Sequence, residues 1–557
     1  MYSLCAAWYA SRVHAVRQRG FWKLPAAFGV LAAAPLVPLL VDLVRSPIPR
    51  FAVDGDYAGL EIATRYALTG RTLLGPYSRF GWNHPGPLYF YVIAPLYALL
   101  GRSSTGLYAG ACVLNLVSIV AVAVTLSLSA PRVEALAALL ALLAWLAAFG
   151  TVCVLPWNPL VVVLPLLAFL VLASQVARGR TAAAPFAVFF GMLAAETHLS
   201  TAPSVLGVSL AAALAFLVAR RQMAFVAKGG RGFAAAALVL LLLCVPMLAE
   251  QHAAHEGNLT KIIHFFTTNK EPPKTFEVAL AHWAEATSWL PRRLLDHGWV
   301  RAPFPQVMAS DPVSDVPPVI ATWSVGGWLA IAIASTAVAL RRRYAFGLSL
   351  LGTGLVGSLI ALFAFRAVVG KTMYYLLFPA TAASTLVWMG VAATCMRIVT
   401  EAAVRVGAER ALRRCAVGLT LLAATGATWL THEWARASQW HPRPLPGAEA
   451  AYGALLARVR STGETPIVHA DGGGWYIALL LLNELSRDGV EPRVEGRDRW
   501  ILGAQFPDPG GAPRPLHVYP RLDRDHLDVP HCLDRLVASE GIEIFVSPVD
   551  ARACPSQ

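Results

Sequence analysis

Long apolar segments alternate with short polar segments along most of the chain. An α-helix needs about 20 apolar residues to cross a bilayer, and in lipid only helices or closed barrels satisfy the backbone polar groups. The pattern therefore predicts an α-helical polytopic membrane protein with about 11 transmembrane helices. The runs are 24–44, 107–129, 133–153, 157–175, 183–197, 201–219, 233–249, 319–340, 346–365, 372–393 and 415–431.

After residue 432 the pattern changes to shorter elements. "TPIVHAD" and "IEIFVSP" are typical of strands, "GGWYIALLLLNELSRDG" of a helix that ends at Gly489, and "RPLHVYP" of a further strand. We expect a transmembrane domain over 1–431 and a small α/β domain over 432–557. "DGGG" (471–474) resembles a phosphate-binding loop only weakly, and a strand-to-helix turn explains it better.

Composition and charge support a membrane protein with a defined orientation. Hydrophobic residues make up 56% of the chain and charged residues 14%, whereas soluble proteins carry roughly 25% charged residues. The net charge of +13 marks cytoplasmic loops rather than nucleic-acid binding. With 11 crossings and the N-terminus inside, the basic segments all fall inside; they are 178–180, 219–232, 341–343 and 395–415.

The outer side then receives the loops 45–106 and 250–318 and the α/β domain. The apolar segment 87–101 is too short to cross, and we place it at the outer interface. Abundant Ala, Arg and Pro indicate a GC-rich bacterial source, so we expect the cytoplasmic (inner) membrane, with the outer parts periplasmic or extracellular. Cys532 and Cys554 pair if that compartment is oxidising.

Three carboxylates follow the first apolar run, in "FAVDGDYAGLEIATRYALTG" (51–70). Asp54 and Asp56 flank a glycine on a predicted turn, and Glu61 lies in the helical pattern after it. A solvated loop explains acidic residues as well as a functional site does. Desolvation near the interface adjusts a carboxyl pKa, and an ordered helix follows, which keeps the functional interpretation open.

The rest of this loop, "GPYSRFGWNHPGPLYFYVIAPLYALLG" (75–101), is rich in Pro, Gly and aromatic residues. This composition predicts a rigid platform. Trp82, Tyr89 and Tyr91 either face a sugar or lipid chain or anchor the loop in the membrane surface. His84 either donates to a phosphate or is a structural residue ahead of Pro85.

Ionisable residues also occur at the outer ends of later helices. Glu196 and His198 in "AAETHLS" either bind acceptor or sugar, or form a buried structural pair. Glu250, His252 and His255 have helical spacing, but three such residues on one helix are a weak metal pattern. A loop helix that covers the cavity is the preferred interpretation of that segment.

Two separated stretches resemble the GT-C membrane glycosyltransferases, particularly the aminoarabinose transferase and protein O-mannosyltransferase group. The first runs through the acidic turn, "EIATRYALTG", "HPGPLYFY" and "LYALLG", and the second is "GKTMYYLLFPATAAS" (370–384). Together they cover about eighty residues. The group has two adjacent acids and "PPL", whereas here Gly55 separates the acids and Gly86 is inserted.

The resemblance implies an inverting glycosyltransferase that moves a sugar from a polyprenyl-phosphate carrier to a glycan, lipid or protein acceptor outside the membrane. Asp54 or Asp56 is the general base, with a slight preference for Asp54. The residues expected to hold the carrier phosphate are Lys371, Arg366 and Arg79, and those expected to bind substrate are Glu196, His198, His84, Tyr89 and Tyr374. The chemistry requires no cofactor; Mg²⁺ or Mn²⁺ between the two acids is the alternative.

Two other functions compete with this hypothesis. A lipid-linked glycan polymerase or ligase is expected to use arginines of a large outer loop. A transporter or flippase for lipid-linked sugars places polar residues near the membrane centre on broken helices. Here the ionisable residues gather toward one face, which favours an enzyme.

Overall fold

The computed structural model describes residues 23–222, 230–294, 318–370, 372–437, 441–469, 474–495, 501, 506, 509–522 and 532–547. Within these residues, nine helical segments are long and apolar enough to cross a membrane. They confirm an α-helical, multi-pass membrane protein. The segments are Lys23–Arg45, Ser104–Ser129, Arg132–Val154, Asn158–Ala177, Leu199–Val218, Gly230–Ala253, Trp323–Arg341, Ala345–Arg366 and Tyr374–Arg405.

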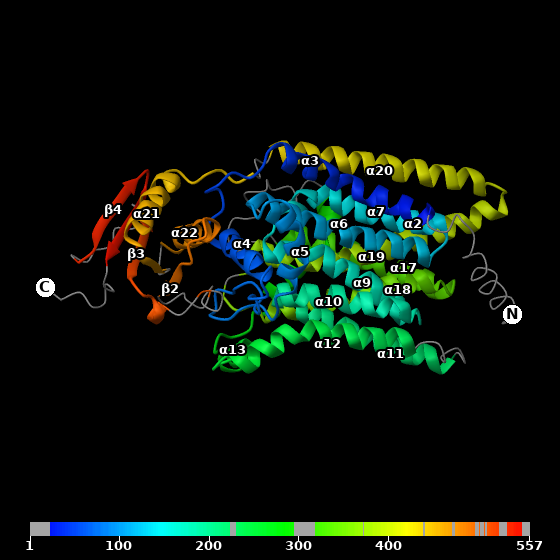
Figure 1. Ribbon diagram of the computed structural model, residues 1–557. Helices are drawn as coiled ribbons and strands as arrows, with labels where there is room; N and C mark the ends of the chain where they lie inside the picture. Colours follow the sequence, from blue (N-terminus) through cyan, green and yellow to red (C-terminus); the bar gives the residue numbers. More distant parts are fainter. Residues whose placement is uncertain are drawn as a thin grey trace.

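These spans form an elongated bundle, in which most helices run side by side (Figure 1). Short 3₁₀ turns interrupt or extend several of them at prolines, which lack the N–H that continues a helix. The helices are α2 (Lys23–Ala33), α3 (Val37–Arg45), α6 (Ser104–Ser129), α7 (Arg132–Phe149), α8 (Asn158–Val161), α9 (Val163–Ala177), α11 (Ala202–Gln222), α12 (Gly230–Ala253), α17 (Pro318–Arg341), α18 (Ala345–Arg366) and α19 (Phe378–Arg405).

The two remaining predicted spans are also helical. α10 (Ala184–Thr197) is a shorter apolar helix that packs on α9 and α12. α20 (Glu409–Ala437) is 29 residues long and lies along α7 and α3, although it is not among the nine segments above. All 11 apolar runs therefore fold as helices, as the pattern predicts.

Shorter helices gather at one end of the bundle. α5 (Leu88–Leu99) has 12 residues and packs on α4, α6 and α10, which agrees with the prediction that this apolar segment does not cross. The other helices of this group are α4 (Gly55–Ala67), α13 (Asn258–Thr268), α14 (Phe276–Thr287) and α15 (Trp289–Leu294).

The C-terminal part forms a five-stranded sheet with the order β2-β1-β3-β5-β4. β1 is parallel to β2 and β3, whereas β5 is antiparallel to β3 and β4. Two helices pack on the sheet, α21 (Ala448–Thr462) and α22 (Trp475–Arg487). The strands are β1 (Thr465–His469), β2 (Arg493–Glu495), β3 (Pro515–Leu522), β4 (Asp534–Ser539) and β5 (Ile542–Ser547), so the predicted α/β texture is confirmed.

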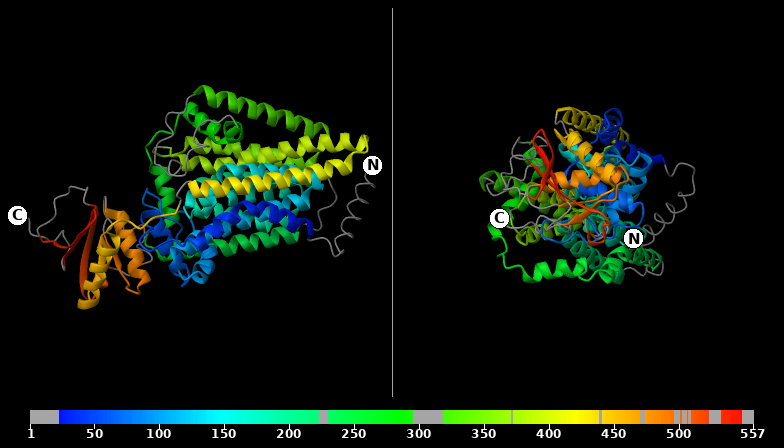
Figure 2. Two further views of the ribbon diagram at one scale, coloured as in Figure 1. Left: turned by 90° about the horizontal axis from the view of Figure 1, so that it is seen from above. Right: turned by 60° about the vertical axis from the view of Figure 1, so that its left-hand side comes forward.

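The sheet region rests on the bundle through α4 (Figures 1 and 2). One hydrophobic cluster joins Phe51, Ala58 and Ile62 to residues of α21, α22 and the strands. α4 contacts α22 along its length. The segment 45–106 is therefore packed between the transmembrane helices and the C-terminal region. The predicted domain boundary near residue 432 stays a prediction.

The basic ends of the helices gather at the opposite end of the bundle. Arg180 donates to Ser129 Oγ over 2.9 Å, which joins the ends of α9 and α6. Arg342 forms an ion pair with Glu401, which joins the end of α17 to α19. Figure 1 shows these helix ends on the side away from the sheet. The bundle therefore has one basic end and one end that carries the segment 45–106.

Cys532 is disulfide-bonded in the structure. Cys554, its predicted partner, lies outside the described residues, so this pairing stays a prediction.

Candidate active site

The two predicted acids lie at the first turn of α4. Asp54 occupies the N-cap position, where Asp usually accepts a hydrogen bond from a backbone N–H of the first turn. Here its side chain makes no such bond. The Asp54 carboxylate therefore does not cap the start of α4, although Asp is a favoured residue at the N-cap position.

Asp56 is held by two aromatic side chains. Trp157 Nε1–H donates to Asp56 Oδ2 over 2.7 Å, and the Tyr77 hydroxyl donates to Asp56 Oδ1. Burial raises the pKa of Asp56 to about 6; the Trp157 hydrogen bond opposes this rise and the charge of Asp54 adds to it. Asp56 is thus a fixed carboxyl group that changes its charge near neutral pH.

Asp54 is buried less deeply than Asp56. Burial raises its pKa above the ordinary value, and a hydrogen bond from its own backbone N–H partly opposes the shift. Two buried carboxyl groups this close repel each other when both are ionised. The first turn of α4 therefore holds two carboxyl groups whose pKa values burial raises above the ordinary value.

The C-terminal region covers this turn with two aromatic residues of α22. A Cβ added to Gly55 would lie 2.5 Å from Tyr476 Cδ1 and 3.5 Å from Trp475. Gly55 also has a φ of +43°, in the left-handed region that disfavours other residues. The glycine that separates the two acids is therefore the contact point of α22, which explains this departure from the family pattern.

We expect Gly55→Ala to lower the free energy of unfolding by about 2 kcal/mol or more. The change adds backbone strain at positive φ and forces α22 away from α4. The matched control is Gly59→Ala in the same helix, where an added Cβ meets nothing within 4 Å. Thermal unfolding in detergent measures both variants, and equal midpoints would disprove the close packing of α22.

A second aromatic pair connects the acids to the segment that precedes α19. The rings of Trp157 and Tyr375 lie 4.7 Å apart, edge to face. The charges of Asp56 and Arg79 both act on Tyr375. An added Cβ at Gly370 would lie 3.3 Å from Arg79 Nη2. The turn at 370 is therefore linked to Asp56 through Arg79, Tyr375 and Trp157.

The segment between α12 and α17 adds a cation, Lys274, that the sequence analysis did not name. Lys274 Nζ donates to the carbonyl oxygen of Gly370, and Lys274 N donates to the Arg366 carbonyl oxygen over 2.9 Å. Arg366 Nε returns a long hydrogen bond to the Lys274 carbonyl. Lys371 lies outside the described residues, so its role stays a prediction. Arg79, Lys274 and Arg366 bring three positive charges to the turn at 366–370, and Glu271, which accepts a hydrogen bond from Gly370 N over 2.8 Å, brings one negative charge.

Glu196, His198 and His84 form a second cluster, at the segment 75–101. Glu196 Oε2 accepts a hydrogen bond from the backbone N–H of Leu88, at the start of α5. His84 Nδ1 accepts from Leu199 N over 3.1 Å, and its ring lies 4.5 Å from that of His198. Burial holds the pKa of His84 well below its usual range. These contacts fix the loop, and substrate binding by the three residues stays a prediction.

The inserted Gly86 belongs to this cluster. A Cβ at Gly86 would collide with the Glu196 carboxylate. The second departure from the family pattern is thus also a close contact, where a short residue lets Glu196 reach the first turn of α5.

Tyr89 connects the two clusters. It is fully buried, and its hydroxyl donates to the Pro156 carbonyl over 2.8 Å. The next residue is Trp157, so Tyr89 supports the turn that delivers the indole to Asp56. Tyr374 is half-buried beside Tyr375. Contact of Tyr89 or Tyr374 with substrate stays a prediction.

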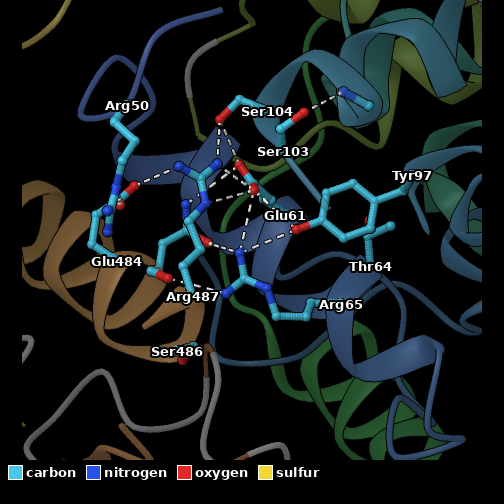
Figure 3. A network of polar contacts seen from close by, with 12 residues as sticks. Arg50, Glu61, Thr64, Arg65, Tyr97, Ser103, Ser104, Glu484, Ser486 and Arg487 are labelled. Carbon is cyan, nitrogen blue, oxygen red and sulfur yellow. Dashed lines mark hydrogen bonds and ion pairs between the residues drawn. The ribbon is translucent and has the colours of Figure 1, made fainter. Parts of the chain in front are cut away.

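Glu61, the third carboxylate of the opening segment, is not part of the acid pair. It is fully buried and forms ion pairs with Arg487 of α22 and with Arg65 (Figure 3). Tyr97 and Ser104 donate to it over 3.0 and 2.8 Å. Glu61 therefore joins the first outer loop to the C-terminal region.

The sequence analysis did not identify five aromatic residues near the acids, Trp157, Tyr77, Tyr375, Trp475 and Tyr476, although Trp157 had a recognisable signal. Trp157 stands in "LPWNPL", where two prolines interrupt an apolar run. Such an interruption at a helix start marks a turn that presents a side chain. Tyr77, Tyr375 and Tyr476 carry no comparable signal, because only the tertiary contacts bring them to α4.

A metal between the two acids stays the alternative prediction. Both Asp56 oxygens accept a hydrogen bond from a protein donor, and each oxygen keeps a further lone pair. In the described part of the chain, the acids also belong to no group of three close metal-binding side chains. A reaction that needs no metal stays the prediction.

Comparison with known proteins gives structural likenesses only. No protein-family model and no curated protein matches the chain. Among solved structures, ArnT from Cupriavidus metallidurans is 13% identical, with a TM-score of 0.49, in the apo state and bound to undecaprenyl phosphate. The matches cover 95% and 97% of this chain and 100% of ArnT.

An oligosaccharyltransferase from Archaeoglobus fulgidus is 12% identical, with a TM-score of 0.34, over 84% of this chain and 64% of the other. At this identity the likeness assigns no residue of the site, so the chemistry must come from the side chains described above.

Proposed function

We propose that the protein is an inverting glycosyltransferase that moves a sugar from a polyprenyl-phosphate carrier to an acceptor at the outer face of the cytoplasmic membrane. The main support is the acid pair of α4, which Trp157 and Tyr375 link to the cations at the turn 366–370. Transfer of a sugar from a lipid phosphate needs a base for the acceptor and cations for the leaving phosphate.

The distribution of charge supports the proposed orientation. Arginines concentrate at the end of the bundle away from the sheet, and cytoplasmic loops carry such an excess. The acid pair and the C-terminal region then face the periplasmic or extracellular side. The disulfide at Cys532 supports this orientation, since disulfides persist in oxidising compartments.

Asp54 is the proposed general base. A base needs a carboxylate oxygen that can accept the proton of the acceptor group as that group attacks the anomeric carbon. Asp56 already accepts two hydrogen bonds, whereas the side chain of Asp54 does not cap its helix. Asp56 holds the side chains of Trp157 and Tyr77 in place through its two hydrogen bonds. When Asp56 is ionised, its negative charge raises the proton affinity of Asp54.

The leaving polyprenyl phosphate is proposed to bind at the turn before α19. Arg79 lies against Gly370, and no described carboxylate forms an ion pair with it. The guanidinium can therefore pair with a phosphate, a geometry that suits its planar fork. Lys371 and Arg366 supply further positive charge. The aromatic side chains between acids and cations, Trp157 and Tyr375, limit the space in which the sugar can lie, and this supports an in-line attack.

The proposal is tested by comparing envelope glycolipids, glycans and glycoproteins from cells with and without the gene, by mass spectrometry. We expect one sugar modification to disappear without the gene. Loss of long lipid-linked chains instead would indicate a polymerase or ligase. Accumulation of an unmodified lipid-linked sugar on the inner leaflet would indicate a flippase.

We expect the transfer rate to rise with pH around 6, because the form with both aspartates ionised is the active one. Trp157→Phe removes the hydrogen bond that stabilises the Asp56 carboxylate, so the pKa of Asp56 rises further above 6. The acidic limb of the pH–rate profile should then move to higher pH by about one unit.

The control for this shift is Trp475→Phe. Trp475 lies edge-on to Tyr77, but within the described residues it donates no hydrogen bond to either aspartate. Its replacement should leave the acidic limb in place. A limb that stays unchanged in Trp157→Phe would show that Asp56 does not control the profile.

A further inference from the structure

Two histidines and a glutamate converge on one face of the C-terminal sheet, away from the acid pair. His469 ends β1, Glu495 ends β2, and His517 is the third residue of β3. The three strands are adjacent and parallel. Each of the three side chains offers one ligand atom, and these atoms lie within 4.8 Å of one another.

The distances between the ligand atoms suit a small metal ion. His469 Nε2 lies 2.9 Å from His517 Nδ1, and His517 Nδ1 lies 3.7 Å from Glu495 Oε2. Ligand atoms bound about 2.0–2.1 Å from a tetrahedral ion lie about 3.4 Å from each other. The two separations bracket this value, so small side-chain movements suffice to admit an ion.

The sheet explains why the three groups meet. Side chains alternate between the two faces of a strand, and Val468, Val494 and Val518 point into the core shared with α21 and α22. His469, Glu495 and His517 therefore share the opposite face. In parallel sheets, ligands bind at the carboxyl ends of the strands, where His469 and Glu495 lie.

The histidines are held in place. His469 and His517 are only 5% and 8% exposed, so their rings are fixed by packing rather than by solvent. The Tyr519 ring stacks on His469 at 4.1 Å, with an angle of 11° between the planes. Ligands whose orientation is fixed before binding lose little entropy when they coordinate an ion.

We propose that His469, Glu495 and His517 form a binding site for one divalent transition-metal ion of the zinc type. Two imidazoles and one carboxylate suit Zn²⁺, Co²⁺ or Ni²⁺, whereas Mg²⁺ and Ca²⁺ prefer oxygen ligands only. Three protein ligands leave a fourth position for water or a small anion. This site is independent of the proposed sugar transfer and is measured without it.

The test uses the full chain in detergent, purified through a tag without histidine and treated with a chelator. On titration with Co²⁺, we expect one equivalent to produce the visible absorption of a tetrahedral site, and Zn²⁺ to displace it. Zn²⁺ should also raise the thermal midpoint of the wild-type protein, because an ion bound only to the folded state stabilises it.

Glu495→Gln and His517→Gln should each weaken Co²⁺ binding about a hundredfold or more, since loss of a ligand exceeds the effect of losing an outer-shell partner. The matched control is Glu543→Gln on β5, another half-buried strand glutamate, which pairs with Arg535. It should bind as the wild type does.

Absence of Co²⁺ absorption and of Zn²⁺ stabilisation in the wild type would overturn the proposal, even if a variant fails to fold. Equal weakening in Glu543→Gln would overturn it as well, because binding would then not depend on this cluster. The proposal would also be overturned if Glu495→Gln and His517→Gln bound Co²⁺ as tightly as the wild type and the control Glu543→Gln do.

Discussion

Asp54→Asn is expected to lower sugar transfer about 10²- to 10⁴-fold, the usual contribution of a positioned base. Asparagine keeps the size of the side chain but cannot take the acceptor's proton. Asp54 makes no capping bond in α4, so the substitution should leave the fold intact. The measurement is complementation of cells that lack the gene, with the sugar modification quantified by mass spectrometry.

Asp56→Asn is expected to be less severe, about 10- to 100-fold, as an effect on a positioning group. An amide presents N–H donors toward the Trp157 or Tyr77 donor, so one of the two hydrogen bonds is lost. Both variants should still insert into the membrane and bind undecaprenyl phosphate, the probe for the carrier site.

The control is Asp42→Asn, an aspartate of α3 that binds His441 and lies outside the acid pair. It should keep full transfer. If Asp56→Asn alone abolishes transfer, the two roles are exchanged. If both variants of the acid pair retain full transfer, neither aspartate is catalytic and the proposed function loses its main support.

Glu61→Ala is expected to lower the free energy of unfolding by about 3–5 kcal/mol, the cost of breaking a buried ion pair from one side. Two guanidinium groups, from Arg65 and Arg487, would lose their common acceptor in a buried place (Figure 3). Because Arg487 belongs to α22, the C-terminal region should also loosen from the bundle. Thermal unfolding and limited proteolysis in detergent measure the two effects.

Glu491→Gln is the matched control, because the Arg71–Glu491 pair also joins the two parts but is exposed. Exposed pairs contribute about 0–1 kcal/mol, so this variant should change little. Glu61→Gln should fall between the two, since the amide keeps some of the hydrogen bonds. If Glu61→Ala costs no more than the control, Glu61 does not hold the C-terminal region in place.

The expected loss of transfer in Asp54→Asn and the expected loss of stability in Glu61→Ala assign different roles to two carboxylates that are close in the sequence. Asp54 and Glu61 lie seven positions apart, at the start and in the middle of the same helix. The sequence does not tell a base from a structural anchor here, because both are acids in an ordered segment. The difference arises from the partners: Glu61 meets two arginines, whereas Asp54 meets none of the described basic side chains at ion-pair distance.

The sequence by itself determined the membrane character, the 11 helical runs, the short helix within 87–101 and the α/β texture of the tail. Each follows from local patterns, because length and apolarity decide whether a helix crosses lipid, and alternation decides where a strand forms. The sequence also indicated that a helix begins near Asp54 and Asp56, because these acids follow a long apolar run and precede a helical pattern.

Only the tertiary structure decided which residues surround these acids. Trp157 and Tyr77 come from other segments, and Trp475 and Tyr476 reach Gly55 from more than 400 positions away. The metal-ligand group on β1, β2 and β3 likewise depends on the strand order. Such contacts depend on how distant elements pack, and a pattern that describes one segment at a time contains no information about its neighbours in space.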